Sequence, residues 1–373
     1  MKGINPVTLR LMARRVTDCR IVSQDMTGVI EMGKKQTAAR TLPHPTEIQA
    51  ISLDLGNGYC NLMADGGISA DWRSVQGRLS DATRFNDLPF DDVINISGVW
   101  WAFGAGAYTY AARSLEDFPA TNRYFSEWYK RLFTYALHRA YGVRLGEGIF
   151  YPRVVLSIPA GIFANEDVVQ RVKESLAGDY QIGTTRGSEL RVKIEDGNLQ
   201  IIPEGAGSYI ATATQNQIVQ SGLWYVGDGG YLTFDVIAFR DGDYAPDLSV
   251  SDAAAGMRYV AAAVSRKLHA AAGNEVRPED IDPYLTCDAI TINGRAYPIG
   301  EHRATAICQL VERVAGFITR SMSGQNLTGI ILTGGGAEVL RTGLEQALVP
   351  LTVIVAPNPR RANVLGGFAL IGG

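Results

Sequence analysis

The sequence predicts an α/β fold in two domains, and three observations lead to it. At 373 residues the chain is longer than one simple hydrophobic core usually needs. From about residue 51 onward, apolar strand-like segments alternate with segments of helical periodicity. Two of the strands run into the same short pattern, Asp-x-Gly followed by a second β-rich segment. This alternation with a repeated hairpin favours two similar α/β halves.

The composition is that of a soluble globular protein. Apolar residues make up 46% of the chain, charged residues make up 20%, and the formal net charge is −3. This mild negative charge gives no reason to expect direct binding of nucleic acid. No apolar run reaches the ~18 residues that cross a membrane, and the N-terminus lacks the apolar segment of a secretion signal. We therefore expect a cytoplasmic protein with reduced cysteines and no membrane contact.

Residues 1–47 differ in charge from the rest of the chain. They carry eight Lys or Arg residues against four Asp or Glu residues, and they end in the breaker-rich segment LPHPTE. We interpret them as a basic N-terminal extension, either a plain one or an arm that docks on the body or on a partner. The α/β pattern then predicts a first domain over 48–204, completed by the C-terminal helices 335–373, and a second domain over 205–334.

Hydrophobic periodicity assigns the elements in order. The first half contains strands near 51–56, 94–103 and 153–160, a helix over 120–141 with an aromatic stripe, and a helix over 164–176 capped by Asn165. Short strands follow within 179–202, and a helix begins near Gly205. The second half contains a hairpin over 223–239, helices over 253–272 and 300–322, strands at 328–332 and 351–355, a helix to about 347 and a last helix from about 360. Asn293-Gly294 marks a further tight hairpin turn.

The two Asp-x-Gly segments are candidate phosphate-binding hairpins. Glycine in a tight turn permits close approach, so the N–H groups of the turn can point at an anion. Each turn also carries an aspartate where Mg²⁺ bound to a phosphate would sit. The alternative for each is an ordinary β-turn, and Thr233 is either a phosphate ligand or a local hairpin contact. The candidate residues are Asp54, Gly56, Asn57 and Gly58 in the first hairpin and Asp228, Gly230, Tyr231 and Thr233 in the second.

Two further features stand at strand-to-helix junctions. Gly334, Gly335 and Gly336 follow an apolar strand, where consecutive glycines let the backbone lie against a base or ribose beside a helix N-terminus. Glu204 stands at the start of a helix, either as its cap or as a group that orients a water molecule. The chain has neither a P-loop nor a dinucleotide-binding glycine motif, and its four histidines form no metal-binding pattern.

The order of these motifs resembles that of the actin-like ATPase superfamily. Within it the chain looks most like the plasmid-segregation actins of the ParM/StbA type and their archaeal and phage relatives. Beside the hairpins, the resemblance rests on the segments VVLSIPAGIF, IIPEGAGSYI and NPRRANVLGGFAL. It covers residues 51–373 and implies an actin-like fold, with two similar α/β domains on either side of a nucleotide cleft. The chain departs from the family pattern at Asn57 and Gly58, where many relatives have Ser or Thr.

The resemblance also implies roles and partners. Glu204 and Asp228 are the catalytic candidates: Glu204 would position the attacking water, and Asp228 with Asp54 would hold Mg²⁺. Gly334, Gly335 and Gly336 would face the adenosine. The implied activity is that of an ATPase that binds ATP or GTP and assembles head to tail into filaments, in plasmid or DNA segregation. An adaptor protein bound to centromere-like DNA would be the partner.

Two alternatives to this function stay open at the level of the sequence. One is a small-molecule kinase of the same fold, for which Asp235 or Asp252 would be the base that activates a substrate hydroxyl. The other is a nucleotide-binding scaffold that does not polymerise, which the departures in the hairpins favour.

Overall fold

The computed structural model describes residues 49–79, 90–116, 123–144, 148–273 and 275–372. The extension predicted over residues 1–47 lies outside this part of the chain, as does Cys19. Within it, Cys60, Cys287 and Cys308 are free thiols. None of the described helices is both long enough and apolar enough to pass through a bilayer. The α/β class predicted from the alternation of strands and helices is confirmed.

A five-stranded first sheet carries the first predicted hairpin. Its strand order is β12-β9-β1-β2-β3, with β1 parallel to β9 and antiparallel to β2. The central strand β1 is apolar and almost wholly buried because α11 covers one face of it and α3 the other. The strands are β1 (Ala50–Leu55), β2 (Tyr59–Ala64), β3 (Ile68–Arg73), β9 (Arg153–Ile158) and β12 (Leu199–Pro203).

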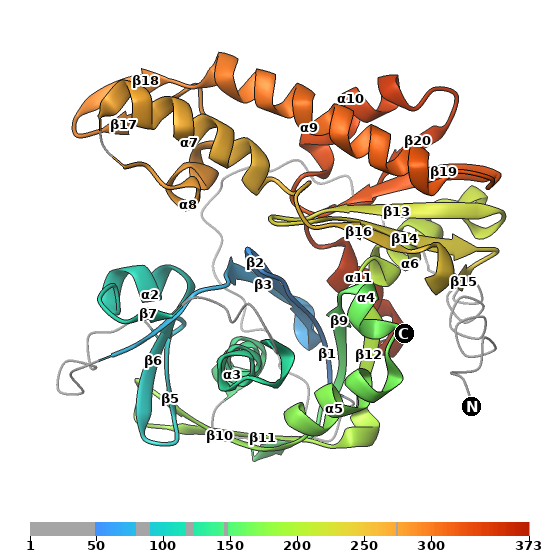
Figure 1. Cartoon of the computed structure of the whole chain (residues 1–373). Coiled ribbons are helices and arrows are strands. Elements are labelled where there is room, and N and C mark those ends of the chain that lie inside the picture. Colours follow the sequence, from blue (N-terminus) through green and yellow to red (C-terminus); the bar gives the residue numbers. More distant parts are fainter. Residues whose placement is uncertain (1–48, 80–89, 117–122, 145–147, 274, 373) are drawn as a thin grey trace, which may run out of the picture.

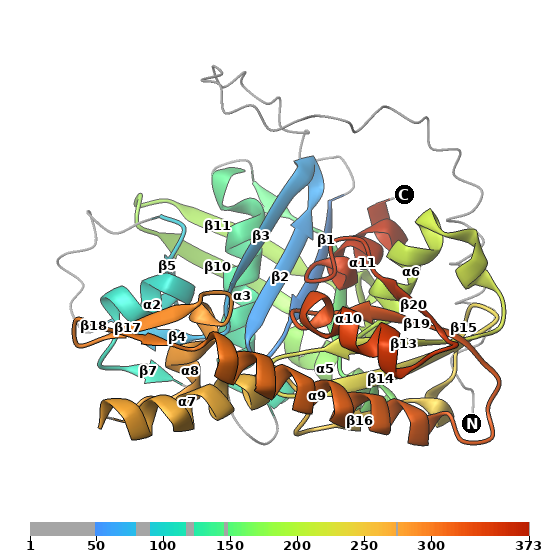
Figure 2. The same ribbon diagram turned by 90° about the horizontal axis from the view of Figure 1, so that it is seen from above.

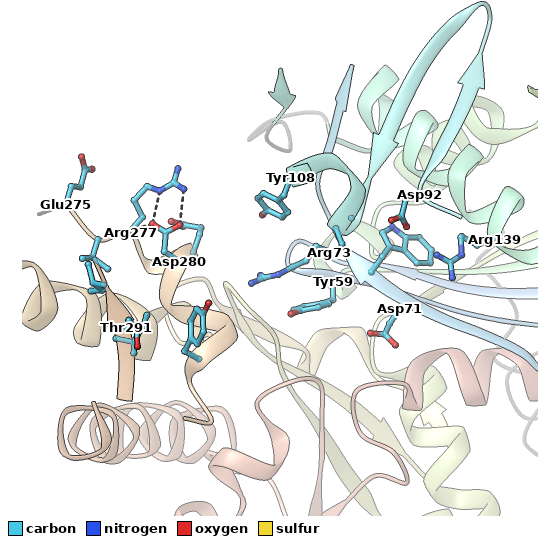
Figure 3. A pocket seen from close by; sticks show the side chains of 18 residues that line it. Tyr59, Asp71, Arg73, Asp92, Tyr108, Arg139, Glu275, Arg277, Asp280 and Thr291 are labelled. Atoms are coloured by element: carbon cyan, nitrogen blue, oxygen red, sulfur yellow. Dashed lines mark hydrogen bonds and ion pairs between the residues drawn. The ribbon is translucent and has the colours of Figure 1, made fainter. Parts of the chain in front are cut away.

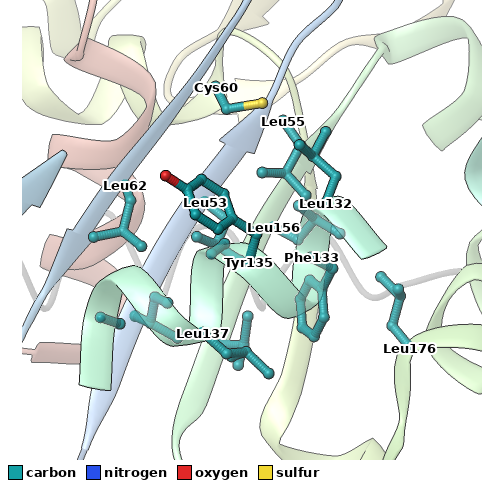
Figure 4. Packing of buried hydrophobic residues seen from close by; sticks show 14 of the residues in the cluster. Leu53, Leu55, Cys60, Leu62, Leu132, Phe133, Tyr135, Leu137, Leu156 and Leu176 are labelled. Atoms are coloured by element: carbon teal, nitrogen blue, oxygen red, sulfur yellow. The ribbon is translucent and has the colours of Figure 1, made fainter. Parts of the chain in front are cut away.

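A second sheet encloses α3 (Glu127–Tyr141) against the first sheet, as Figure 1 shows. The helix begins after Ser126, whose hydroxyl accepts a backbone N–H of the first turn at 3.2 Å. Its aromatic stripe is core packing: Phe133 and Tyr135 lie among apolar side chains such as Leu53 of the first sheet (Figure 4). The second sheet has the order β7-β4-β6-β5-β10-β11-β8, from β4 (Gln76–Arg78), β5 (Val93–Ile96), β6 (Val99–Phe103), β7 (Leu115–Glu116), β8 (Ile149–Phe150), β10 (Gly178–Thr184) and β11 (Glu189–Ile194).

A third sheet carries the second predicted hairpin, and long helices cover it. Its order is β15-β14-β13-β19-β20, with β16 paired to β14. Figure 2 shows α9 running across this part of the molecule, with α7 beside it toward α8. Asn293 and Gly294 form the predicted tight turn of the β17–β18 hairpin, with φ of 51° and 77°. The strands are β13 (Leu223–Gly229), β14 (Phe234–Arg240), β15 (Asp243–Tyr244), β16 (Val250–Asp252), β17 (Ala289–Ile292), β18 (Arg295–Pro298), β19 (Leu327–Thr333) and β20 (Thr352–Val355).

The remaining helices cover the sheets or join them. Helix α6 contacts strands of the first and third sheets and packs closely on α11, which also covers β1 and β9. The two helices therefore link the two halves of the molecule. The helices are α2 (Gly104–Tyr110), α4 (Ala160–Phe163), α5 (Glu166–Leu176), α6 (Ala206–Gln215), α7 (Arg258–Ala272), α8 (Pro278–Ile281), α9 (Gly300–Ser321), α10 (Ala337–Ala347) and α11 (Ala362–Gly372).

The structure differs from the predicted elements at the start of α7. The alanine-rich segment predicts a helix from 253, but the helix begins at Arg258. The backbone N–H groups of Gly256, Met257 and Arg258 donate to carbonyls of the β13–β14 turn at 3.2, 3.0 and 2.8 Å. These tertiary hydrogen bonds outweigh the helix propensity of the preceding alanines.

The C-terminal segment also divides differently from the prediction. We assigned 335–373 to the first domain, yet α10 packs on α9 and β20, and β20 pairs with β19 of the third sheet. Of the helices in this segment, α11 is the one that packs on the first sheet. The apolar strand β20 extends the third sheet in parallel, so the helix that connects it to β19 must cover that same sheet.

Candidate functional site

Nearly all predicted site residues line one cavity of about 450 Å³. It is bounded by the β1–β2 turn of the first sheet and by the β13–β14 turn of the third sheet. Gly336 is the exception, because its N–H donates to Gly229 at 2.8 Å and ties the glycine turn to the second hairpin. The predicted residues that line the cavity are Asp54, Gly56, Asn57, Gly58, Glu204, Asp228, Gly230, Tyr231, Thr233, Gly334 and Gly335.

The first hairpin turn, Gly56–Gly58, is held by two side chains that the sequence did not single out. Ser74 donates its hydroxyl and its N–H to two carbonyl groups of the turn. Arg123 donates to the Asn57 side chain and to carbonyls at the end of β1 and in the turn. Arg123 is only 7% exposed and itself lines the cavity. The turn is therefore anchored through its carbonyl groups.

The second hairpin turn closes on itself and touches the first. The N–H of Gly230 donates to the carbonyl of Thr233 at 3.0 Å, and the Thr233 hydroxyl donates to Asp235 at 2.6 Å. Thr233 thus makes the local hairpin contact in this structure. A Cβ atom added to Gly58 would lie 2.8 Å from Cβ of Tyr231, so glycine at that position lets the two turns meet.

The third turn stands beside an apolar end of the cavity. Gly334 has φ of +81°, and a Cβ atom there would overlap a carboxylate oxygen of Asp228. Apolar side chains from the start of α7, from α9 and α10 and from the segment after α8 line the cavity: Met257, Val260, Leu285, Ile307 and Val339. Such a surface suits a flat base, whereas the hairpin turns offer backbone N–H groups and carboxylates.

Four carboxylates share the polar end of the cavity. Burial raises the pKa of Asp54. The pKa of Asp228 is raised to about 8, mainly by burial and further by the negative charges of Asp54 and Asp235. Burial also raises the pKa of Asp235, against the hydrogen bonds from Ser251 and Thr233. The negative charge of these groups is therefore poorly compensated by the protein itself.

Glu204 is the fourth carboxylate, and it is not a helix cap. The N-cap of α6 is Gly205, with φ of +88°, and no side chain caps the helix there. Burial raises the pKa of Glu204 well above its usual value, and Asp54, Asp235 and Asp228 add to the effect. The side chain lines the cavity, so of the two sequence-based interpretations the geometry favours contact with a bound molecule or water.

Asn363 of α11 joins the aspartates of both hairpins. Its Nδ2 donates to Asp54 at 3.2 Å and to Asp228 at 3.3 Å. Its Oδ1 accepts the N–H of Gly205 at 3.0 Å and the hydroxyl of Ser208 at 2.8 Å. These donors set the orientation of the amide, so its NH₂ group faces both carboxylates. The sequence pointed to Asn363 only as part of a closing-helix pattern.

The residues at this end fit Mg²⁺. No three or more His, Cys, Asp or Glu side chains are grouped as metal ligands among residues that the structure describes. Mg²⁺ does not need such a group, because one or two carboxylates with water and phosphate oxygens complete its shell. Asp54 and Asp228 are oxygen donors that share one amide, and their raised pKa values reflect negative charge that a divalent cation would offset.

A second hollow of about 740 Å³ lies at the mouth of this site. It separates β3 and α2 on one side from the α8 and β17 region on the other, as Figure 3 shows. Tyr59 lines both hollows. Between the two sides, Arg73 forms an ion pair with Asp282 of the segment after α8 at 2.9 Å. This ion pair bridges the mouth in this conformation.

Comparison with known proteins identifies the fold. Residues 226–346 match the family model described as archaeal actin homologue MreB-like, C-terminal. No curated protein matches the chain by sequence. The chain is similar to the archaeal actin homologue Ta0583 in complex with ADP, at 21% identity and a TM-score of 0.71, over 86% of this chain and 98% of that chain.

Two ParM structures are also similar. A 15-stranded ParM filament from Clostridium botulinum matches at 17% identity and a TM-score of 0.70, over 86% of this chain and 98% of that chain. Bacillus thuringiensis ParM with ATP matches at 16% identity and a TM-score of 0.62, over 87% and 97%. The predicted resemblance is therefore confirmed at the level of the fold: this chain has an actin-like fold, similar to the folds of ParM and of an archaeal actin homologue.

Proposed function

We propose that this chain binds ATP or GTP with Mg²⁺, hydrolyses the nucleotide and couples the cycle to its own assembly into filaments. One observation carries the proposal: two Asp-x-Gly turns, a glycine turn and the half-buried Glu204 surround a single cavity. The volume of about 450 Å³ lies in the range of small-molecule sites. We also propose that two domains close on the nucleotide from either side of this cavity. The first comprises residues 48–204 together with α11, and the second runs from residue 205 to the end of β20.

The two ends of the cavity would take the two ends of the nucleotide. The apolar side chains and Gly334–Gly335 would contact the base and ribose. The N–H groups of the two hairpin turns would bind the phosphates, except that of Gly230, which donates to Thr233. Asp54 and Asp228 would hold Mg²⁺, which supplies charge neutralisation of the phosphates when bound. Asn363 keeps these two carboxylates in place through its amide group.

Glu204 is suited to orient the attacking water. Its side chain is half-buried, lines the cavity and does not cap α6. A carboxylate in this position accepts a hydrogen bond from water and aligns its lone pair with the terminal phosphate. Replacing this group should therefore slow hydrolysis much more than it weakens binding of the nucleotide.

Filament formation is proposed from the relatives. A ParM protein of the same fold forms a 15-stranded filament. A head-to-tail contact of this chain would be heterologous and open-ended, with the nucleotide state deciding its strength. We propose that such filaments act in plasmid or DNA segregation through an adaptor bound to centromere-like DNA, with no direct contact between this chain and DNA.

The kinase alternative finds less support in the geometry. Asp252 pairs with Arg313 at 2.7 Å and does not line the cavity. Asp235 does line it, but Thr233 and Ser251 hydrogen-bond to its carboxylate. Neither aspartate is placed as an unengaged base facing a substrate hydroxyl.

Pelleting and light scattering with ATP, GTP, ADP and a non-hydrolysable analogue test the proposal, with phosphate release followed in parallel. We expect nucleotide-dependent pelleting. Glu204→Gln should form filaments that persist because hydrolysis is slowed about 100-fold or more. Asp252→Asn, at a half-buried side chain outside the cavity, is the matched control and should pellet and hydrolyse nucleotide as the wild type does.

Each failure points to one alternative. Nucleotide turnover only with an added sugar or other hydroxyl acceptor would favour the kinase. Nucleotide binding without pelleting, over a wide range of protein concentration, would favour the scaffold. No binding of any nucleotide would overturn the proposed function altogether.

A further inference from the structure

Arg123 occupies an unusual position for an arginine. It begins the short 3₁₀ turn Arg123–Phe125 before α3, and it is only 7% exposed. Its guanidinium carbon lies 5.4, 5.6 and 5.7 Å from the ring centroids of Tyr129, Trp128 and Tyr124. Three aromatic rings around a guanidinium restrict its movement and compensate for part of its lost hydration. The head group is therefore held in a defined orientation.

The guanidinium makes a fork-like contact with the first hairpin. Its Nη1 donates to the side-chain oxygen of Asn57. Its Nη2 donates to the carbonyl of Leu55, and also to that of Gly56 at 3.0 Å. One side chain thus binds three consecutive residues of the β1–β2 turn. Only a planar group with several fixed donors makes such a set of contacts.

Holding these carbonyls also orients the N–H groups of the turn. A peptide group is planar and trans, so its N–H points opposite to its C=O. Because the carbonyls of Leu55 and Gly56 point at Arg123, the N–H groups of Gly56 and Asn57 point away from it. Gly56 and Asn57 line the cavity. The contact therefore fixes one orientation of these two peptide groups, which a flexible glycine turn could otherwise reverse.

We propose that Arg123 is the positioning residue of the phosphate-binding turn: it presents the N–H groups of Gly56 and Asn57 to the nucleotide phosphates. The assignment rests on the proposed nucleotide-binding function. Arg123 acts through the turn, so it contributes to binding of the phosphates and not to binding of the nucleoside. A purely charge-balancing role beside the carboxylates would need only a cation, which lysine also supplies.

Arg123→Lys separates these roles because lysine keeps the charge but has no planar fork. Arg131→Lys is the matched control, since Arg131 lies on α3, stacks on Trp101 at 3.9 Å and pairs with Glu116, away from the cavity. Calorimetric titration would measure the Kd of ATP and of adenosine, or of GTP and guanosine where the wild type prefers them. Asn57→Ala removes one partner of the guanidinium without altering the buried arginine, and it tests the proposal where Arg123→Lys folds poorly.

We expect Arg123→Lys to raise the Kd of the triphosphate about tenfold or more, the effect of a lost charged hydrogen bond, and to leave the nucleoside Kd within about twofold. Asn57→Ala should also raise the Kd of the triphosphate relative to that of the nucleoside, but by a smaller factor. Arg131→Lys should leave both dissociation constants unchanged. The assignment would be overturned if the Kd values of triphosphate and nucleoside rose equally. It would also be overturned if neither Arg123→Lys nor Asn57→Ala weakened binding of the triphosphate. A wild type that binds nucleosides and nucleotides equally would overturn it as well, and a wild type that binds neither would overturn the proposed function with it.

Discussion

Gly207 of α6 and Gly366 of α11 pack backbone against backbone where the two helices cross. A Cβ atom added to Gly366 would overlap the carbonyl oxygen of Gly207, and one added to Gly207 would overlap that of Asn363. Both helices bring cavity residues into place, because Glu204 precedes Gly205, the N-cap of α6, and Asn363 lies in the first turn of α11. The two glycines therefore set the spacing between two parts of the site.

Gly366→Ala should destabilise the protein by about 1–3 kcal/mol, because the backbone atoms that the new methyl group meets cannot rotate aside. Urea unfolding of the nucleotide-free protein measures this difference. Gly161→Ala is the control, since Gly161 lies in helix α4 with nothing within 4 Å of an added Cβ. If Gly366→Ala unfolded at the same urea concentration as the control, the two helices would not be closely packed in solution.

The glycine motifs could be found from the sequence because each meets a conformational requirement of its own turn. Asp54 and Asp228 stand at the same place in two hairpins, and Gly334 needs a positive φ beside Asp228. Short-range patterns of this kind survive in a single sequence. The cavity that they form was then predictable from the order of the motifs.

Arg123 and Ser74 could not be found in the same way. Arg123 reaches Asn57 across 66 positions of the chain, and Ser74 reaches Gly56 across 18. Neither stands in a recognisable motif, and an arginine before a helix is most often solvated. Their roles follow from tertiary contacts, as does the late start of α7, which depends on hydrogen bonds to the β13–β14 turn.

Asn363→Asp should destabilise the metal-free protein by about 2–4 kcal/mol at neutral pH. The variant replaces a donor to Asp54 and Asp228 by a third carboxylate in a buried site. Saturating Mg²⁺ and nucleotide should recover part of the loss, since they offset the added charge. Thermal unfolding in EDTA and in Mg²⁺ with nucleotide measures both effects.

Asn165→Asp is the matched control for this charge change. Asn165 caps α5, and its side chain accepts the N–H of Val168 at 3.1 Å, which aspartate does equally well. The control should change stability by less than about 1 kcal/mol. Equal effects of the two substitutions would contradict the role of Asn363 as the link between the two aspartates.

The metal-free protein should lose stability as the pH rises. Asp228 has its pKa raised from 3.8 to about 8, by burial and then by Asp54 and Asp235. Between these two pKa values the folded state therefore binds more protons than the unfolded chain. The contribution of Asp228 to the free energy of unfolding is complete below about pH 4 and is lost as the pH rises through 8. We expect the melting temperature in EDTA to fall by several degrees between about pH 5.5 and 8.

Asp228→Asn should flatten this dependence and raise the melting temperature at the higher pH. The exposed Asp247→Asn should leave the pH profile of the wild type unchanged. A wild-type profile that is flat or rises over this interval would show that the buried carboxylates are compensated by groups other than those identified. Mg²⁺ with nucleotide should reduce the slope because a bound cation favours the ionised form.

The ion pair between Arg73 and Asp282 should slow the escape of nucleotide. Its atoms are 2.9 Å apart, the side chains are 19% and 13% exposed, and it joins β3 to the segment after α8 across the mouth of the cavity. Asp282→Asn removes the charge and should raise the dissociation rate of a fluorescent nucleotide about tenfold in stopped-flow chase experiments, with a smaller effect on association. Asp280→Asn is the control, because Asp280 in the adjoining helix α8 pairs at the surface with Arg277, at 3.0 Å. Equal dissociation rates for the two variants would mean that the mouth closes without this pair, whereas a faster rate in Asp282→Asn alone would identify it as the contact that retains the nucleotide.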